Sequence, residues 1–129
     1  AAAFAAGAEG IQMGTRFVSS AESPVHDNFK NSILSAEIND TLLLNKKSKP
    51  IIRALKTELT HQIDEVGSMD MSALAGIKDL YFGGNMNAAP ALSGQSSGLI
   101  KKVISVEEII NQTVAEFNDR CKQMSNYKF

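Results

Sequence analysis

Apolar side chains recur at helical spacing in several parts of the chain. The Ser-Pro pair at positions 23–24 is typical of a helix start, and Val25, Phe29 and Ile33 follow it four residues apart. This pattern predicts a helix of about a dozen residues that ends near Ala36.

Two further helices are expected in the middle of the chain, after a polar and basic stretch at positions 39–49 that we interpret as a loop. The first is expected to open at Pro50 and to end at Gly67, and a shorter helix is expected near positions 71–80. The apolar face of the first consists of Ile52, Leu55, Leu59, Ile63 and Val66.

The C-terminal third combines a long loop with a helix. Turn-forming residues fill positions 83–90, and the loop is expected to continue through positions 93–98. Ser105 begins an S-x-x-E capping box that predicts the last helix. Positions 126–129 are expected to fray. One face of this helix carries Val106, Ile109, Ile110, Val114, Phe117 and Cys121.

The start of the chain has the pattern of one step of a parallel α/β fold. An alanine-rich segment at positions 1–6 favours a helix, Gly7 is suited to end it, and the apolar stretch 11–13 predicts a short buried strand that ends at Gly14. A parallel strand needs neighbours on both sides, but the chain offers no other convincing strand. No capping residue precedes the first helix either. We therefore expect this sequence to be the C-terminal part of a longer protein.

Composition narrows the class of protein. The 129 residues are 43% apolar and 21% charged, with 13 Lys plus Arg against 14 Asp plus Glu, which fits one globular unit but is too short for a complete (β/α)8 barrel of about 250 residues. Scattered charge argues against a nucleic-acid partner, and no apolar run approaches the roughly 18 residues of a membrane span. The single cysteine, Cys121, excludes an internal disulfide framework and a cysteine-based zinc site, which favours the cytoplasm.

Candidate chemistry begins at Gly14 and Thr15, directly after the predicted strand. Ligands of α/β folds bind at this end of the strands, where glycine lets a phosphate oxygen approach backbone N–H groups and a threonine hydroxyl adds a donor. The alternative interpretation is that Gly14 and Thr15 form a simple turn that requires glycine. Arg16 is suited to pair either with a phosphate or with Glu22.

Other polar residues have simpler interpretations. His26 is expected to cap or pack its helix, and His61 is expected to pair on the surface with Glu58 and Glu65. Asp64 completes an H-x-x-D pattern, but no third ligand follows at a useful spacing for a metal. We interpret Cys121 as a small core residue. Positions 46–49 carry three lysines in a solvated loop, and docking of an acidic carrier protein is the alternative.

Two motifs closely resemble those of a known family. The string 8–17, A-E-G-I-Q-M-G-T-R-F, with Glu22, His26, Phe29 and Lys30 after it, resembles the end of the flavin domain of the nitronate monooxygenase (2-nitropropane dioxygenase) family. This family includes FMN-dependent enoyl-acyl-carrier-protein reductases. Positions 93–100 are similar to its A-G-Q-x-x-G-L-[IV] segment, with serine in place of the first alanine.

The resemblance implies an α/β fold: the C-terminal fragment of an FMN-binding (β/α)8 TIM barrel, mostly helical within these residues. Residues 1–36 would end the barrel, and residues 37–129 would form a helical segment packed on it. The resemblance assigns the FMN phosphate to Gln12, Met13, Gly14 and Thr15. The family's catalytic residues come from earlier strands, so no catalytic residue is assigned here. The rest of the barrel is expected upstream.

The implied activity is oxidation of a small-molecule substrate, an alkyl nitronate, and the second choice is reduction of an enoyl thioester by an FMN-dependent enoyl-acyl-carrier-protein reductase. Gln95 would lie near the substrate, or would tie its loop to the barrel rim. A rival of another class is a non-catalytic helical binding module, in which methionines form a groove for a partner. Those methionines are Met69, Met71, Met86 and Met124.

Overall fold

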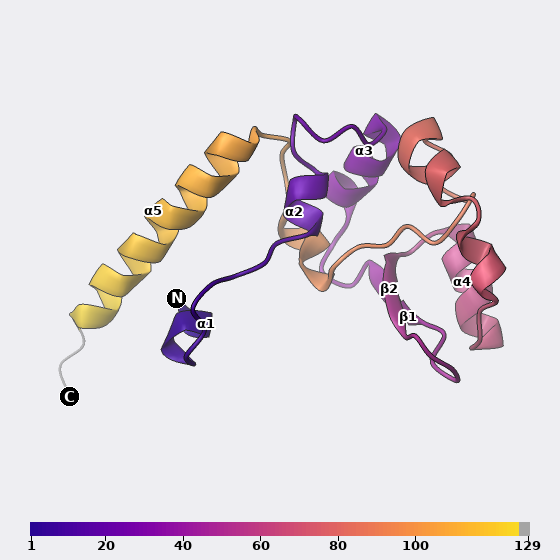
Figure 1. The fold of residues 1–129 in the computed structure, drawn as a ribbon, viewed down its shortest axis with the longest axis horizontal. Helices are drawn as coiled ribbons and strands as arrows, with labels where there is room; N and C mark the ends of the chain where they lie inside the picture. The colour runs from indigo at the N-terminus through magenta and orange to yellow at the C-terminus, as the bar shows by residue number, and fades with distance from the viewer. Residues whose placement is uncertain (127–129) are drawn as a thin grey trace.

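The computed structural model describes residues 1–126 and divides them into a body and a peripheral region. In Figure 1 the body contains α2, α3, α4 and a small sheet, while α5 extends away from it with α1 nearby. The helices are α1 (Ala2–Ala5), α2 (Thr15–Val18), α3 (Asp27–Ser35), α4 (Glu58–Val66) and α5 (Val106–Ser125), and the strands are β1 (Thr41–Leu44) and β2 (Ile52–Leu55).

The N-terminal segment agrees with its sequence pattern in part. Helix α1 forms, and Gly7 follows it with φ of 93°, the left-handed conformation that favours glycine after a helix. Residues 11–13 belong to no strand, and Ile11 is 56% exposed. The expected buried strand is therefore absent from the described residues, which is consistent with the expectation that its partners lie elsewhere.

The sheet corrects two sequence-based predictions. The expected loop at positions 39–49 contains β1, and the expected helix from Pro50 begins instead as β2, which pairs with β1 in antiparallel register. On its other side β2 receives the segment 91–93, since Leu55 N–H donates to Ala91 O (2.9 Å). The spacing of Ile52 and Leu55 suits a helical face, but pairing on both sides of β2 overrides that local preference.

Only the second half of the expected helix forms, as α4. Thr57 and Thr60 make a reciprocal capping box that starts it, and Gly67, with φ of 76°, ends it. Before it, the hairpin turn is held by buried Asn45, whose Nδ2 donates to Pro50 O (2.9 Å). The Oδ1 of Asn45 accepts from the N–H of Met69 (3.1 Å), so one amide joins the hairpin to the segment after α4.

Helix α3 starts later than expected. His26 is its N-cap, and the Nδ1 atom accepts a hydrogen bond from the N–H of Asn28 (3.1 Å), which confirms the capping role predicted for this histidine. The helix therefore begins at Asp27 rather than at the Ser-Pro pair. Its last residue is Ser35, next to the predicted end.

Two other predictions change in detail. The helix expected near 71–80 is split into a 3-10 turn (η1, Met71–Leu74) and a π-helical turn (η2, Asp79–Gly83), and the expected loop 93–98 contains a 3-10 helix (η3, Gln95–Leu99). Gly76 lies between the first two turns, where a Cβ atom would overlap the carbonyl group of Ala88. This close approach of two backbones is a tertiary constraint that local propensity does not contain.

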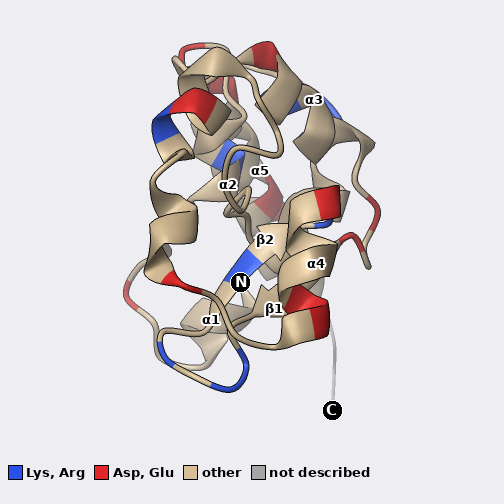
Figure 2. Cartoon of the chain, turned by 90° about the vertical axis from the view of Figure 1, so that its right-hand side faces the viewer, with Lys and Arg blue, Asp and Glu red and all other residues tan. Residues whose placement is uncertain are grey.

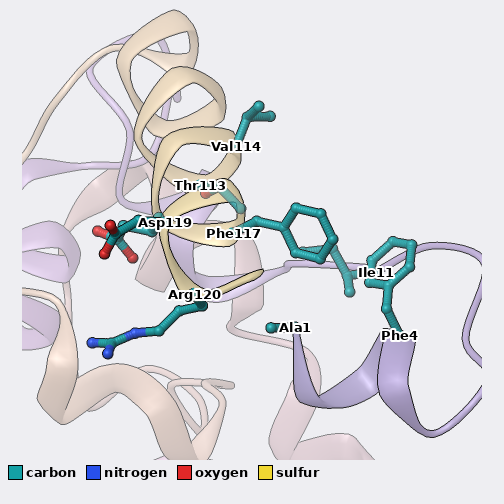
Figure 3. A pocket seen from close by; sticks show the side chains of 9 residues that line it. Ala1, Phe4, Ile11, Thr113, Val114, Phe117, Asp119 and Arg120 are labelled. Carbon is teal, nitrogen blue, oxygen red and sulfur yellow. The ribbon is translucent and has the colours of Figure 1, made fainter. Parts of the chain in front are cut away.

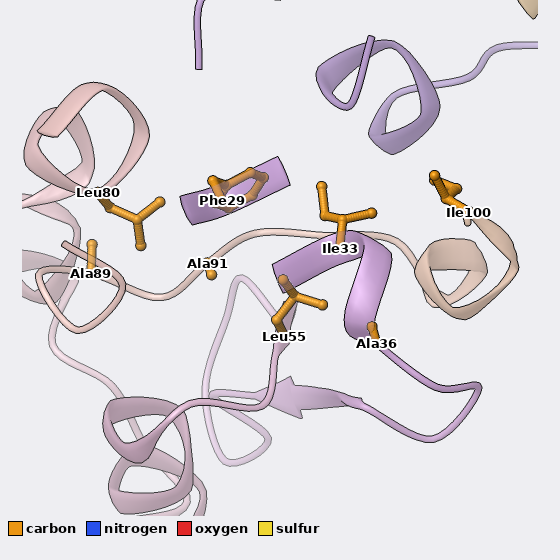
Figure 4. Close-up of a cluster of buried hydrophobic side chains, with 8 residues drawn as sticks. All are labelled: Phe29, Ile33, Ala36, Leu55, Leu80, Ala89, Ala91 and Ile100. Carbon is orange, nitrogen blue, oxygen red and sulfur yellow. The ribbon is translucent and has the colours of Figure 1, made fainter. Parts of the chain in front are cut away.

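Two clusters of buried apolar side chains form the core. The larger one joins α3 to β2, η2 and the segment that leads to η3 (Figure 4). The smaller one lies between the hairpin and α4 and contains Leu44, Ala54, Ile63 and Met69. The larger cluster contains residues from both predicted parts of the chain, 1–36 and 37–129. The division of the chain into a barrel end and a helical segment stays a prediction. The buried members of the larger cluster are Phe29, Ile33, Ala36, Leu55, Leu80, Ala89, Ala91 and Ile100.

Helix α5 forms as predicted but buries little. The hydroxyl of Ser105 accepts from the N–H of Glu108 (3.1 Å) and caps the helix. Of its expected apolar face only Ile109 is buried, and Cys121 is exposed, so the prediction of a core cysteine is wrong for this chain. The reason is that α5 leaves the body after its first turns (Figure 1). Asn126 is the C-cap, and the rest of the expected frayed end lies outside the described residues.

No described helix is both long and apolar enough to cross a membrane. In Figure 2 the basic and acidic positions are distributed over several elements of the ribbon, and one loop is mainly basic.

Candidate functional site

The two sequence motifs meet at one hollow of about 750 Å3. Thr15, at the start of α2, and Gly94, just before η3, are 79 positions apart, yet the N–H of Gly94 donates to Thr15 Oγ1 (2.8 Å). The segment 12–16 lines one side of the hollow, and segments 99–102 and α5 line others. Gln12, Met13, Gly14 and Thr15 are all among the residues that line this hollow.

The backbone beside the hollow has unused donors. Within residues 1–126, the N–H groups of Gly14, Thr15 and Arg16 donate to no protein acceptor, as is normal for the first turn of a helix. The Cβ position of Gly14 has no atom within 4 Å, so the glycine leaves open space over these N–H groups. An anion with several oxygens is the chemistry that such a backbone segment accepts.

The charge of the lining is basic. Arg16, Lys101 and Lys102 line the hollow with one acidic residue, Glu116. The Nζ atom of Lys101 donates to Ala36 O (2.8 Å). The Nζ atom of Lys102 lies 3.6 Å from Oε1 of Glu108 in α5, and the lysine side chain remains largely exposed. The lining therefore favours a negatively charged ligand.

Arg16 joins two walls of the hollow and does not pair with Glu22. Its Nη1 atom donates to Lys102 O (3.0 Å) and to Ser19 Oγ (3.3 Å). Both carboxylate oxygens of Glu22 instead accept from the N–H of Val106 (3.0 Å each), at the first residue of α5. The Glu22 alternative for Arg16 is therefore wrong in this structure.

Gln95 lies on the surface beside the hollow but does not line it. Its side chain makes no hydrogen bond within the described residues. The serines of the same loop behave differently: Ser97 is fully buried, and its hydroxyl donates to Gly94 O (2.6 Å). The loop is therefore held by Ser97 rather than by Gln95.

The residues present fit the phosphate group of FMN. A phosphate presents several negatively charged acceptor oxygens, and the hollow offers free backbone N–H groups, a threonine hydroxyl and a basic lining. Of the predicted set, Gly14 and Thr15 supply this chemistry directly. Gln12 and Met13 supply the adjoining wall.

The remaining sequence candidates do not form a second reactive site. Asp64 accepts from Lys46 Nζ (2.6 Å), and residues 1–126 contain no cluster of three side chains suited to a metal. Lys47 Nζ donates to Val66 O (3.0 Å), so two of the three loop lysines make contacts within the chain. His61 makes no ion pair within the described part, so its predicted pairing is wrong.

Two ionisable side chains outside the hollow have a shifted pKa. Burial raises the pKa of Tyr81, whose ring packs 4.9 Å from that of Phe29. The hydrogen bond from the N–H of Ser72 lowers the pKa of Asp70, which caps η1. Both shifts have structural causes and indicate no catalytic group.

A second hollow of about 470 Å3 lies between the N-terminal segment and α5. Figure 3 shows Phe4 and Phe117 facing each other there beside Ile11, and the two rings are 5.1 Å apart. Its wall is mainly apolar, with charged residues such as Arg120 also lining it. Aromatic and aliphatic contacts of this kind favour packing against another protein segment over chemistry.

Sequence reasoning missed part of the hollow. Lys101 and Lys102 line it, and the signal for them in the sequence is a pair of adjacent lysines directly after the second motif. The α5 residues Gln112, Thr113 and Glu116 gave no local signal. Their role depends on how α5 passes α2, which is a tertiary property.

Comparisons with known proteins agree with this arrangement. A family model described as nitronate monooxygenase matches residues 1–116. A probable nitronate monooxygenase from Staphylococcus saprophyticus is 29% identical over 122 residues, which are 88% of this chain and 34% of that protein. A (3aS,4S,5R,7aS)-5-hydroxy-7a-methyl-1-oxo-octahydro-1H-indene-4-carboxyl-CoA dehydrogenase from Rhodococcus jostii is 39% identical over 69 residues, 54% of this chain and 20% of that protein.

Solved structures match the whole arrangement of elements. FabK from Thermotoga maritima has a TM-score of 0.91 and 33% identity, covering 98% of this chain and 42% of that chain. Its M276A mutant has a TM-score of 0.86 and 34% identity, with 98% and 40% covered. This chain therefore spans less than half the length of each protein compared. Because the family model matches nearly the whole chain, the chain belongs to the nitronate monooxygenase family.

Proposed function

We propose that this chain is the C-terminal part of an FMN-dependent oxidoreductase that oxidises alkyl nitronates, and that its hollow holds the FMN phosphate. The observation that carries the proposal is that Gly94 N–H donates to the Thr15 hydroxyl beside a basic hollow that Gly14 and Thr15 line. The family model across residues 1–116 supports the same assignment.

The chain's own residues bind and orient the cofactor. The N–H groups of Gly14 and Thr15 and the Thr15 hydroxyl donate to phosphate oxygens, while Gln12 and Met13 form the adjoining wall. When bound, FMN supplies the hydride or electron acceptor for the reaction, and the protein fixes its orientation. No residue of this chain is assigned as a catalytic acid or base.

The upstream part of the protein completes the site in this proposal. The relatives are far longer than this chain, and the segment 11–13 pairs with no strand among residues 1–126. We assign the missing part to the earlier strands of a (β/α)8 barrel, whose last helix-strand step is residues 1–14. The single cysteine, exposed and unpaired, favours the cytoplasm as the compartment.

Enoyl-thioester reduction is the second candidate. It is favoured by the relative from Rhodococcus jostii, whose name specifies a carboxyl-CoA substrate and whose identity of 39% exceeds that of the nitronate monooxygenase relative. A helical binding module is a weaker rival, because Met69 is buried in the smaller core cluster and Met86 packs against the larger one. Filling of the core accounts for these two methionines, whereas Met71 in η1 and Met124 in α5 are 49% and 54% exposed and lie on separate elements.

Two assays on the full-length protein separate the activities. Oxidation of propionate-3-nitronate with flavin turnover would support the first candidate, and NADH-dependent reduction of a crotonyl thioester would support the second. A flavin-loaded protein that catalyses neither reaction would contradict the proposed activity.

Gly14→Asp tests the phosphate site independently of the substrate. The added carboxylate would stand over the N–H groups of the helix start and repel the phosphate, since two like charges 4 Å apart cost about 1 kcal/mol even in water. We expect purified Gly14→Asp protein to lose its flavin absorbance while the far-UV circular dichroism stays that of the wild type. Stoichiometric flavin in this variant would show that Gly14 is a turn residue only.

Gln95 is the proposed substrate-side residue, and its exposure makes a kinetic test direct. Since its side chain ties down no other part of the described structure, Gln95→Ala should keep the melting temperature and the FMN content. Loss of one hydrogen bond worth about 0.5–1.5 kcal/mol should lower kcat/KM roughly three- to tenfold. An unchanged kcat/KM would remove Gln95 from the site.

A further inference from the structure

We propose that the hydrogen bond from Gly94 N–H to Thr15 Oγ1 couples the FMN phosphate to the loop 93–98, so that binding of FMN stabilises this loop against local opening. The inference rests on the proposed FMN site and deepens it. It makes Thr15 a connector and Gly94 and Ser97 positioning residues for the cofactor.

The hydroxyl of Thr15 has the capacity to serve two partners. A threonine hydroxyl has one O–H donor and two acceptor lone pairs. In this structure it accepts from Gly94 N–H at 2.8 Å and donates to no protein group within the described residues. The remaining O–H is free for a phosphate oxygen, and a hydroxyl that already accepts a hydrogen bond is a stronger donor.

Gly94 is in turn held from behind by buried serines. Its carbonyl accepts from Ser97 Oγ (2.6 Å), and Ser97 Oγ lies 2.6 Å from Ser93 Oγ. The N–H of Ser93 donates to Arg53 O in β2 (3.2 Å). A continuous set of hydrogen bonds therefore leads from the sheet through the loop to Thr15.

The loop is also fixed against α3 on its far side. A Cβ atom on Gly98 would lie 2.5 Å from the carbonyl carbon of Glu37, so η3 packs directly on the backbone that follows α3. Within residues 1–126, the Gly94–Thr15 bond is the one hydrogen bond that joins the segment 12–18 to the loop 93–99. A ligand that fixes the Thr15 hydroxyl therefore acts on the loop through this bond.

Thermodynamic reciprocity makes the coupling measurable in both directions. If FMN stabilises the loop against opening, then a change that favours the open loop must weaken the affinity for FMN correspondingly. Ser97 is suited to this test because it does not line the hollow, so a direct contact with FMN does not explain an effect of its substitution.

The first experiment compares Thr15→Val with Thr15→Ser in the full-length protein. Hydrogen exchange of the amides at 93–99 is measured without FMN and with saturating FMN. In the wild type and in Thr15→Ser, FMN should slow exchange there by about fivefold or more, whereas Thr15→Val should lose this protection even when saturated. Equal FMN-dependent protection in Thr15→Val would overturn the coupling.

The second experiment measures FMN affinity by fluorescence titration. Ser97→Ala should raise the Kd about three- to tenfold through loss of the bond to Gly94 O. Thr60→Ala is the control, because Thr60 is buried and hydrogen-bonded in α4 but lies outside the lining of the hollow. It should lower the melting temperature and leave the Kd within twofold of the wild type.

The outcomes distinguish this inference from the proposed function. A wild-type protein that binds no FMN contradicts both. Normal FMN binding that Gly14→Asp abolishes, together with a wild-type Kd in Ser97→Ala, contradicts the coupling alone.

Discussion

The middle of the chain and its two ends bury very different shares of their apolar side chains. In the body, residues 15–104, Phe29, Ile33 and Leu80 are fully buried. In the periphery, residues 1–14 with α5, Ile11 is 56% and Val114 is 53% exposed, and Ile109 is the one buried residue of α5. The body is thus held by its core, whereas the periphery is held mainly by local hydrogen bonds and by the contact between Phe4 and Phe117.

Local polar contacts explain why α5 is helical without a core beneath it. Its cap at Ser105 is followed by side-chain pairs four residues apart, Gln112 with Glu108 (2.8 Å) and Gln123 with Asp119 (2.7 Å). Its exposed apolar residues are therefore free to pack against a further protein segment. FabK places the same elements in the same way within a chain more than twice as long. This agrees with the proposal that an upstream barrel packs against the exposed apolar residues of α5.

The largest expected difference in stability is between alanine substitutions of two phenylalanines, one in the body and one in the periphery. Phe29→Ala removes a fully buried ring from the larger cluster and should cost about 3–5 kcal/mol of unfolding free energy. Phe4→Ala, at a site 42% exposed in α1, should cost about 0.5–1.5 kcal/mol through its contact with Phe117. Urea denaturation of the 129-residue chain measures both. Equal costs would contradict the division into body and periphery.

The cap of α5 has an intermediate effect. Ser105→Ala removes the acceptor for the N–H of Glu108 and should cost about 1 kcal/mol, with loss of helical circular dichroism in the periphery. Ser105→Asp, which restores an acceptor at the cap, is the matched control. If Ser105→Ala left both signals unchanged, tertiary contacts rather than the cap would hold α5.

The smallest effect in this chain is expected at Val114. Because its side chain is 53% exposed, Val114→Ser should change the stability of the 129-residue chain by less than about 0.5 kcal/mol. In the full-length protein the same change should cost more than about 1 kcal/mol, because the proposed barrel covers this face. Equal and small effects in both proteins would show that the face stays exposed.

Much of the candidate site could be predicted from the sequence, but its assembly could not. Gly14 and Thr15 are visible as a glycine and a donor directly after a short apolar segment, whereas Gln12, Met13 and positions 93–100 were assigned through the resemblance to the nitronate monooxygenase family. That Gly94 N–H meets Thr15 is a contact across 79 positions, which no local pattern encodes. Whether these residues hold FMN stays a prediction that Gly14→Asp tests.

The sequence by itself determined the features whose hydrogen bonds are local. The cap at Ser105 and the left-handed Gly67 that ends α4 each depend on groups within a few positions of one another, and the sequence predicts both. The threonine box that starts α4 is equally local, but the sequence pattern predicts a helix that starts at Pro50 instead. Only the tertiary structure decided that residues 52–55 form a strand and that Cys121 is exposed. The physical reason is that strand pairing and burial depend on groups far apart in the chain, and these override the weak preferences of a short apolar segment.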